Sequence, residues 1–267
     1  MRVVPEDRDA YGAELKAYLR DGSRVETVER DDGYIAPFDG VPNYFASHKD
    51  WPPPEKVAIK LAHGRVLDVG CGAGRVALHL QGKGHKVIGI DNSPGAIRIC
   101  RSRGVRDARL MDFGSIDATL GRIDTVVLFG NNFGLFSSFA TARRVLRRLD
   151  GLCSPDATII ASVTDPYGTE NPDHLSYHKR NRERDRMGGQ LRLRVRHRRV
   201  IGPWFDYLLV SERELKQILD GTNWRLAHVL RDKGPHYIAI LEKKFRNSAT
   251  EATTSRKSAR KRAGTKA

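Results

Sequence analysis

Apolar residues gather in short runs along the middle of the chain, and amphipathic stretches separate these runs. Apolar runs of about four to eight residues between turn residues are typical of buried strands, and the intervening stretches have the period of helices. Such alternation predicts an α/β fold, with a parallel sheet covered by helices on both faces. The expected strands are 65–70, 85–91, 108–113, 123–130 and 157–165, and the expected helices are 74–84, 93–104 and 137–150.

The end of the apolar pattern predicts one more helix and a hairpin. Residues 211–221 begin with Ser211 and have Glu214 three positions later, as in a capping box. Two apolar strands follow at 224–231 and 236–243, and their short connection requires antiparallel pairing. We therefore expect a seven-stranded sheet whose last strand is antiparallel.

A hairpin inserted within 166–210 has a different pattern. Apolar residues alternate with arginines from 191 to 196, so one face of this strand is apolar and the other is basic. A Gly-Pro pair at 202–203 separates it from a second apolar run at 204–210. The basic face is either a solvated surface or a contact for an anionic substrate, RNA or an acidic partner.

The first 60 residues are expected to form a cap or lid. They contain a helical stretch at 7–20, a hairpin signal at 31–33 and a helix that begins near Pro53 and stops at Gly64. The aromatic residues that either cover a ligand or pack as ordinary core are Tyr34, Tyr44 and Phe45.

Charge adds the question of a nucleic-acid partner. The 267 residues have a net charge of +15, which lies almost entirely in 179–199 and 243–267 on an otherwise neutral body. Residues 244–267, which make up nearly all of the second segment, are expected to be a disordered basic tail. Both segments could contact nucleic acid, although a nucleic-acid-binding protein usually has a continuous basic face.

Cysteine content and hydropathy indicate a cytoplasmic protein. The three cysteines are scattered, without a C-x-x-C pair, so neither a disulfide framework nor a zinc site is expected. We see no signal peptide at the start and no stretch apolar enough for a membrane span. A monomer or a homodimer is compatible with this composition.

The most informative segment is VLDVGCGAGR at 66–75, where a strand leads through three glycines into a helix. Glycine is needed where the backbone turns sharply close to a ligand. Arg75 stands where a dinucleotide fingerprint has its last glycine, and the Asp68 carboxylate would repel a pyrophosphate. A ligand with an amine and a sulfonium suits Asp68 better.

Two further carboxylates follow at the ends of the next strands. Asp91 is placed to accept hydrogen bonds from ribose hydroxyls. Asp112 can accept from an adenine amino group, and Phe113 could stack on the ring. The glycine turn, Asp91, Asp112 and Phe113 follow one another in this order, and this order argues against a plain tight turn without a ligand.

These motifs, with GIDNSPGAI and LMDF, resemble the class I S-adenosylmethionine-dependent methyltransferases, in particular bacterial small-molecule enzymes of unassigned substrate. The similarity covers residues 60–165 and the ending at 211–243, and it implies a Rossmann-like domain over 61–243. It also implies that the cofactor is S-adenosylmethionine. The candidate cofactor-binding residues are Asp68, Gly70, Cys71, Gly72, Gly74, Asp91, Asn92, Asp112, Phe113, Gly130 and Asn131.

The acceptor side has no certain catalytic signature. Residues 129–134 follow the fourth strand and lack the prolines typical of enzymes that methylate exocyclic base amines. His174 and His178 are four apart, but no third ligand accompanies them, so no metal is expected. The candidate catalytic residues are Asn132, Tyr177 and His178.

Three functions agree with these observations. The favoured one is methyl transfer from S-adenosylmethionine to a small molecule. The second is a nucleic-acid methyltransferase that uses the arginine hairpin and the basic tail. The third is a module that binds the cofactor without catalysis.

Overall fold

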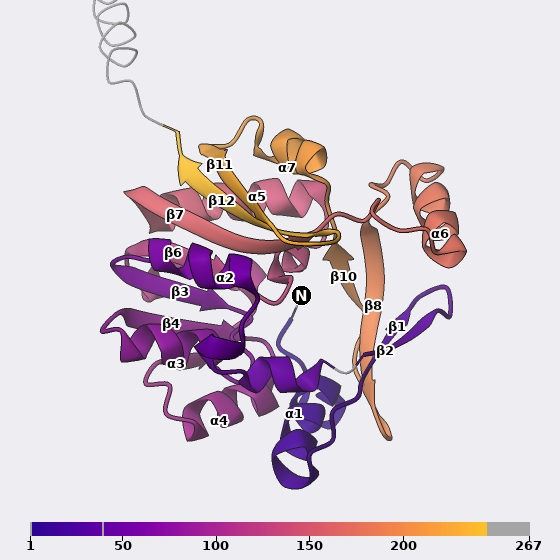
Figure 1. The fold of residues 1–267 in the computed structure, drawn as a ribbon, viewed down its shortest axis with the longest axis horizontal. Coiled ribbons are helices and arrows are strands. Elements are labelled where there is room, and N and C mark those ends of the chain that lie inside the picture. The colour runs from indigo at the N-terminus through magenta and orange to yellow at the C-terminus, as the bar shows by residue number, and fades with distance from the viewer. Residues whose placement is uncertain (1, 39, 245–267) are drawn as a thin grey trace, which may run out of the picture.

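The computed structural model describes residues 2–38 and 40–244. The basic tail lies outside these residues, and so its expected disorder stays a prediction. The described part is built on two sheets, and the smaller one lies beside the edge of the larger one (Figure 1).

The larger sheet has seven strands in the order β11-β12-β7-β6-β3-β4-β5. Its parallel part and its antiparallel end confirm the predicted Rossmann-like architecture. Hydrophobic side chains point alternately to its two faces, as the pleat requires. The strands are β3 (Arg65–Val69), β4 (Lys86–Asp91), β5 (Ala108–Leu110), β6 (Ile123–Leu128), β7 (Cys153–Thr164), β11 (Trp224–Arg231) and β12 (His236–Lys243).

Helices cover both faces of this sheet. On one face, α5 (Phe139–Leu152) and α7 (Glu212–Leu219) bury their apolar sides against residues such as Leu67. On the other face, α2 (Pro53–Ala58), α3 (Arg75–Gly82) and α4 (Pro94–Ser102) pack around residues such as Val66. The predicted capping box of α7 is present.

The smaller sheet joins the N-terminal segment to the insertion. Its order is β10-β8-β1-β2, with β9 (Val200–Ile201) beside β8. The predicted hairpins are β1 (Glu26–Arg30) with β2 (Ile35–Phe38), and β8 (Gln190–His197) with β10 (Phe205–Leu208). Pairing of β1 with β8, between Thr27 and Arg196 and onward, was not predictable from either hairpin.

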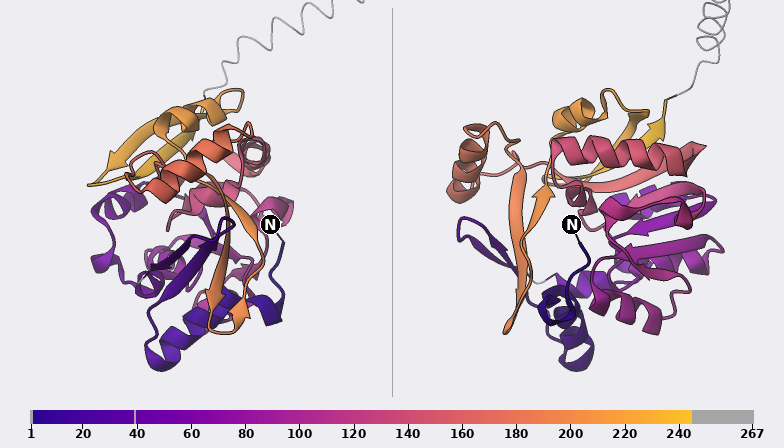
Figure 2. Two further views of the ribbon diagram at one scale, coloured as in Figure 1. Left: turned by 90° about the vertical axis from the view of Figure 1, so that its right-hand side faces the viewer. Right: turned by 180° about the vertical axis from the view of Figure 1, so that it is seen from behind.

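Helix α1 (Ala10–Asp21) fastens this N-terminal segment to the large sheet (Figure 2). A Cβ atom on Gly12 would lie 2.7 Å from Cα of Gly95, so the two helix backbones are in close contact. The Asp9 carboxylate accepts hydrogen bonds from the main-chain nitrogens of both glycines and from the Ser93 hydroxyl. One side chain therefore serves the N-termini of α1 and α4.

Some element boundaries differ from the prediction. β5 ends at Leu110 rather than at residue 113, because a turn begins at Asp112. Helix α6 (Pro172–Arg182) was not assigned from the sequence because it has few apolar residues and no clear period. Its start does have a recognisable signal, since Asn171 caps it and Pro172 occupies its first position.

Among the described helices, none is long and apolar enough to cross a membrane.

Candidate functional site

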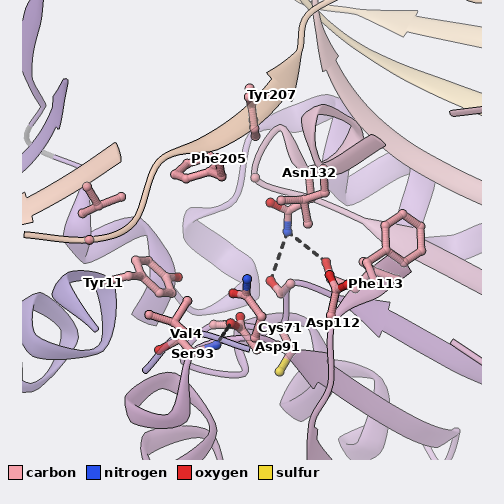
Figure 3. Close-up of a pocket in the computed structure, with 18 of the residues that line it drawn as sticks. Val4, Tyr11, Cys71, Asp91, Ser93, Asp112, Phe113, Asn132, Phe205 and Tyr207 are labelled. Atoms are coloured by element: carbon pink, nitrogen blue, oxygen red, sulfur yellow. Dashed lines mark hydrogen bonds between the residues drawn. The ribbon is translucent and has the colours of Figure 1, made fainter. Parts of the chain in front are cut away.

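A cavity of about 780 Å³ lies between the carboxyl ends of the parallel strands and the smaller sheet (Figure 3). Ligands of open α/β sheets bind at this edge, where the chain leaves neighbouring strands in opposite directions. The volume is within the range of small-molecule sites. One wall comes from the turns after β3, β4 and β6, and the other from the N-terminal segment, β1, β8 and β10.

The glycine turn after β3 is held close to β4. Main-chain nitrogens of Gly70 and Cys71 donate to the carbonyl oxygen of Ile90 at 2.8 and 3.0 Å. Gly70 and Gly72 have positive φ angles of +66° and +53°. A Cβ on Gly72 would lie 2.6 Å from the Tyr11 hydroxyl, so the turn has no room for a side chain.

Gly74 has a different role from its two predecessors. It does not line the cavity, and a Cβ there would meet Sγ of Cys100 at 2.9 Å and the Val105 side chain at 2.8 Å. Gly74 therefore permits close packing of the start of α3 against α4.

Asn132 supports the turn from the loop after β6. Its Nδ2 donates to the carbonyl oxygens of Val69 at 2.9 Å and Gly70 at 3.0 Å. Gly130 also lines the cavity, whereas Asn131 is not among the lining residues. Asn131 has a left-handed conformation, and its side-chain oxygen accepts from the Thr164 hydroxyl at 3.0 Å.

Two buried carboxyl groups flank the glycine turn. Asp91 accepts from the main-chain nitrogens of Gly72 at 3.0 Å and Ser93 at 2.9 Å, and burial raises its pKa to about 6. Burial raises the pKa of Asp68 to about 7, although the positive charge of Arg75 opposes this. Among the described residues, Oδ2 of Asp68 has no hydrogen-bond partner.

Asn92, Asp112 and Phe113 extend the cavity beyond Asp91. The Phe113 ring packs edge-on against Phe136, with centroids 5.2 Å apart, inside the core of the large sheet. In Figure 3 this ring points away from Asp91 and Asp112. Phe113 therefore places the end of β5 through core packing, and the stacking role expected for it is not supported by this orientation.

The N-terminal segment closes one side of the cavity. The main-chain nitrogen of Val4 donates to the carbonyl oxygen of Asn92 at 2.9 Å, and Nδ2 of Asn92 donates to the carbonyl oxygen of Arg2 at 3.2 Å. The right-hand view in Figure 2 places this segment between the two sheets.

The opposite wall contains residues that sequence reasoning did not assign to the site. They come from separate segments that are brought together by the β1–β8–β10 pairing and by the contacts of α1. No local motif marks them, although Tyr44 was considered for a lid. These lining residues are Tyr11, Glu26, Tyr44, Trp204, Phe205 and Tyr207.

Two candidate catalytic residues lie on α6, away from this cavity. The Tyr177 hydroxyl donates to Asp31 at 2.6 Å, and the His178 ring is 5.6 Å from that of Tyr167. The pKa of Tyr177 is raised to about 12 by burial and by Asp31, while burial lowers that of His178. Of the three candidates, the structure brings only Asn132 to the cavity.

The other aromatic residues considered for a lid pack elsewhere. Tyr34 lies edge-on against His174, with centroids 5.1 Å apart, and Phe45 packs on Tyr18 at 4.8 Å. Both fit the ordinary-packing alternative.

Two of the three arginines on the basic face of β8 form ion pairs within the chain. Arg194 and Arg196 both pair with Glu29 of β1, at 2.8 and 2.9 Å. The Arg194 guanidinium also lies 4.4 Å from the ring centroid of Trp204.

Comparison with known proteins agrees with this geometry. Residues 66–156 match the family described as a methyltransferase domain. A 2-heptyl-1-hydroxyquinolin-4(1H)-one methyltransferase of Mycobacteroides abscessus is 32% identical, over 33% of this chain and 46% of its own length. A second relative, from a Geobacillus species, is 24% identical over 42% of this chain and 51% of its own. The chain thus spans about half the length of these relatives.

Solved structures extend the similarity to both sheets. A methyltransferase from Bacteroides fragilis, solved with S-adenosyl-L-homocysteine, has a TM-score of 0.77 and 24% identity over 91% of this chain and 98% of its own. Another, from Methanosarcina mazei, has a TM-score of 0.56 and 17% identity, over 74% and 100%. Residues 66–156 therefore resemble a methyltransferase domain, and the chain has the fold of the S-adenosylmethionine-dependent methyltransferases.

Proposed function

We propose that this chain is an S-adenosylmethionine-dependent methyltransferase whose acceptor is a small molecule. The observation that carries the proposal is the cavity of about 780 Å³, which has the glycine turn on one wall and the smaller sheet on the other. This arrangement can hold a cofactor and an acceptor side by side, and such positioning supplies much of the rate of a transfer reaction.

The residues of the glycine-turn wall fit this cofactor. Gly70 and Gly72 line the cavity with left-handed backbone conformations, and the methionine part can lie against the turn that they form. The unpartnered Oδ2 of Asp68 is suited to a positively charged amine. Asp91 retains lone pairs beyond its two main-chain hydrogen bonds, and these can accept from ribose hydroxyls.

The same wall also contains Asn92, Asp112 and Gly130, and we assign these residues to the binding of the adenosine part of the cofactor. Cys71 is buried, and its thiol pKa is raised by Cys100, 3.8 Å away, and by burial, so it acts as a small wall residue. When bound, the cofactor supplies an electrophilic methyl group, and the chain's task is to orient an acceptor and exclude water.

A small acceptor agrees better with the geometry than a polynucleotide does. The N-terminal segment and the smaller sheet line one side of the cavity, and Arg194 and Arg196 of β8 pair with Glu29. A nucleic-acid methyltransferase would need these cations for phosphates.

Calorimetric titration with S-adenosylmethionine and S-adenosylhomocysteine tests the proposal. We expect micromolar binding of both, and Asp91→Ala should weaken it by at least about tenfold through the lost hydrogen bonds. Absence of binding would refute the cofactor assignment. Tight RNA binding that falls steeply between about 50 and 200 mM salt would favour the nucleic-acid alternative instead.

A further inference from the structure

The cavity has an acidic wall beside the glycine turn, formed by Glu26, Tyr11 and Tyr44. Together with Glu14, which is buried and does not line the cavity, these residues are named the carboxylate–tyrosine cluster. Glu26 begins β1, lines the cavity and is 7% exposed. The Tyr44 hydroxyl donates to Oε2 of Glu26 at 2.9 Å. The rings of Tyr11 and Tyr44 meet edge-on, with centroids 5.2 Å apart. The cluster therefore holds a defined shape before any ligand arrives.

Glu14 is the member of the cluster with the most buried carboxyl group. It lies on α1 and is 1% exposed, and neither of its carboxyl oxygens has a hydrogen-bond partner within the described residues. Burial, together with the charges of Glu26 and Asp9, raises the pKa of Glu14 to about 10. Glu14 is therefore protonated at neutral pH. Burial also raises the pKa of Glu26, although the hydrogen bond from Tyr44 opposes this, so Glu26 is the member of the pair that a bound cation would hold in the ionised form.

No cation of the described chain pairs with either glutamate. Arg75 also lines the cavity, but it forms a two-pronged ion pair with Glu55. The other lining arginines have exposed side chains at the mouth, and they are Arg2, Arg8 and Arg192. This part of the cavity lining thus combines a buried carboxyl group with aromatic rings, and no cation of the described residues forms an ion pair with it.

Position relates this cluster to the transfer step. A Cβ on Gly72 would lie 2.6 Å from the Tyr11 hydroxyl and 4.0 Å from Cδ1 of Tyr44, so both rings border the glycine turn. The buried Tyr207 approaches from β10, and the charge of Glu26 contributes to raising its pKa. An acceptor among these rings would lie next to the methionine end of the cofactor.

We propose that the acceptor is an organic amine, bound as a cation by Glu26 and the faces of the surrounding tyrosines. This inference rests on the proposed methyltransferase function. A carboxylate combined with aromatic faces is a recognised arrangement for ammonium groups. An alcohol has no positive charge to offset the burial that raises the pKa of Glu26, whereas an ammonium group does.

The same carboxylate gives the proton of the amine a destination. The bound ammonium transfers one proton to Glu26, which frees the nitrogen lone pair. That lone pair forms the N–C bond to the methyl carbon while the C–S bond breaks and its electron pair stays on sulfur. Glu26 then releases its proton to solvent.

Matched probes test the inference on the full-length protein saturated with S-adenosylhomocysteine. The amines are benzylamine and phenethylamine, and their neutral counterparts are benzyl alcohol and 2-phenylethanol. Affinities are measured by calorimetry and by ligand-observed NMR up to millimolar concentration. We expect at least one amine to bind at least tenfold more tightly than its alcohol, and radiolabelled methyl from S-adenosylmethionine to reach that amine.

Variants identify the group responsible. Glu26→Gln keeps the shape of the side chain but removes its negative charge. It should reduce amine affinity at least tenfold, while the affinity for S-adenosylhomocysteine stays within twofold. Glu29→Gln is the control, because Glu29 lies on the opposite face of β1 and pairs with Arg194 and Arg196. It should leave amine affinity within twofold. Tyr44→Phe, which removes the donor to Glu26, provides a second, milder variant.

The outcomes separate the two proposals. No binding of S-adenosylhomocysteine would refute the methyltransferase function itself. If S-adenosylhomocysteine binds but the protein has equal affinity for the amines and the alcohols, only the amine inference is overturned. The same holds if neither amine binds. If Glu26→Gln weakened the binding of S-adenosylhomocysteine instead of amine binding, Glu26 would belong to the cofactor site and the inference would be wrong.

Discussion

Nδ2 of Asn132 lies 3.0 Å from the carbonyl oxygen of Gly70 and donates a hydrogen bond to it. The loop after β6 thereby sets the position of the turn after β3, although 62 residues separate the two. A second bond from the same nitrogen reaches Val69. Asn132 is thus a positioning residue for the cofactor wall.

We predict that Asn132→Asp weakens S-adenosylhomocysteine binding at least tenfold. An aspartate has the same size, but its carboxylate would face two carbonyl oxygens, so two attractive contacts become repulsive. Asn132→Ala loses only the bonds and should cost about 1–3 kcal/mol in binding or stability. Calorimetry and thermal melting measure these effects, and equal affinities of the wild type and Asn132→Asp would contradict the interpretation.

Gly72→Ala should abolish measurable cofactor binding, since the added methyl would collide with the Tyr11 hydroxyl in a turn whose φ is +53°. Gly84→Ala is the matched control. Gly84 also has a positive φ, of +90°, but no atom lies within 4 Å of its added Cβ. It should cost about 1 kcal/mol of stability from backbone strain and leave cofactor affinity unchanged. Comparable losses of affinity in both variants would argue against close approach at Gly72.

Asp91 should make cofactor affinity depend on pH. Its folded pKa of about 6 means that the carboxylate, which is the better acceptor for ribose hydroxyls, forms as pH rises from about 5 to 7. S-adenosylhomocysteine affinity should therefore increase across that window. Titrations over this range in the wild type and in Asp91→Asn measure the effect, and an identical slope in both proteins would assign it to another group.

The same pKa has the opposite effect on the stability of the ligand-free protein. Because the folded-state pKa of Asp91 is raised above its ordinary value of 3.8, the folded state binds more protons than the unfolded state between about pH 4 and 6. The contribution of this group to stability is present at low pH and is lost as pH rises through about 6. Asp91→Asn should remove this component from denaturant titrations measured at several pH values.

Asp9→Ala should loosen the N-terminal segment. The substitution removes the acceptor for Gly12, Ser93 and Gly95, and loss of a helix cap costs about 0.5–2 kcal/mol for each helix end. Hydrogen exchange should increase in α1 and around Val4 while β3 and β6 remain protected. Glu6→Ala is a suitable control, since its ion pair with Arg98 is exposed. Uniform exchange throughout the chain would instead indicate global destabilisation.

The large sheet and the cofactor wall were predictable because their signals are local. Apolar runs with helical stretches between them predict β3 to β7 as strands of a parallel sheet, and glycines or carboxylates at strand ends are adjacent in the sequence to the strands that carry them. Parallel strands bring these ends to one edge by geometry alone. Asp68, Gly70, Gly72 and Asp91 were assigned to the site in this way, and all four line the cavity.

The acceptor wall depends on long-range pairing that no local pattern encodes. β1 and β8 are separated by about 160 residues, and only their register, with Val28 opposite Val195, brings Glu26, Tyr44 and Tyr207 together around one space. A buried carboxyl such as Glu14 has no signature in the sequence, because burial results from the packing of α1. The sequence by itself therefore determined the sheet and the residues at its strand ends. The tertiary structure alone decided what faces them, because side-chain burial and contacts across a cavity arise from the docking of distant segments.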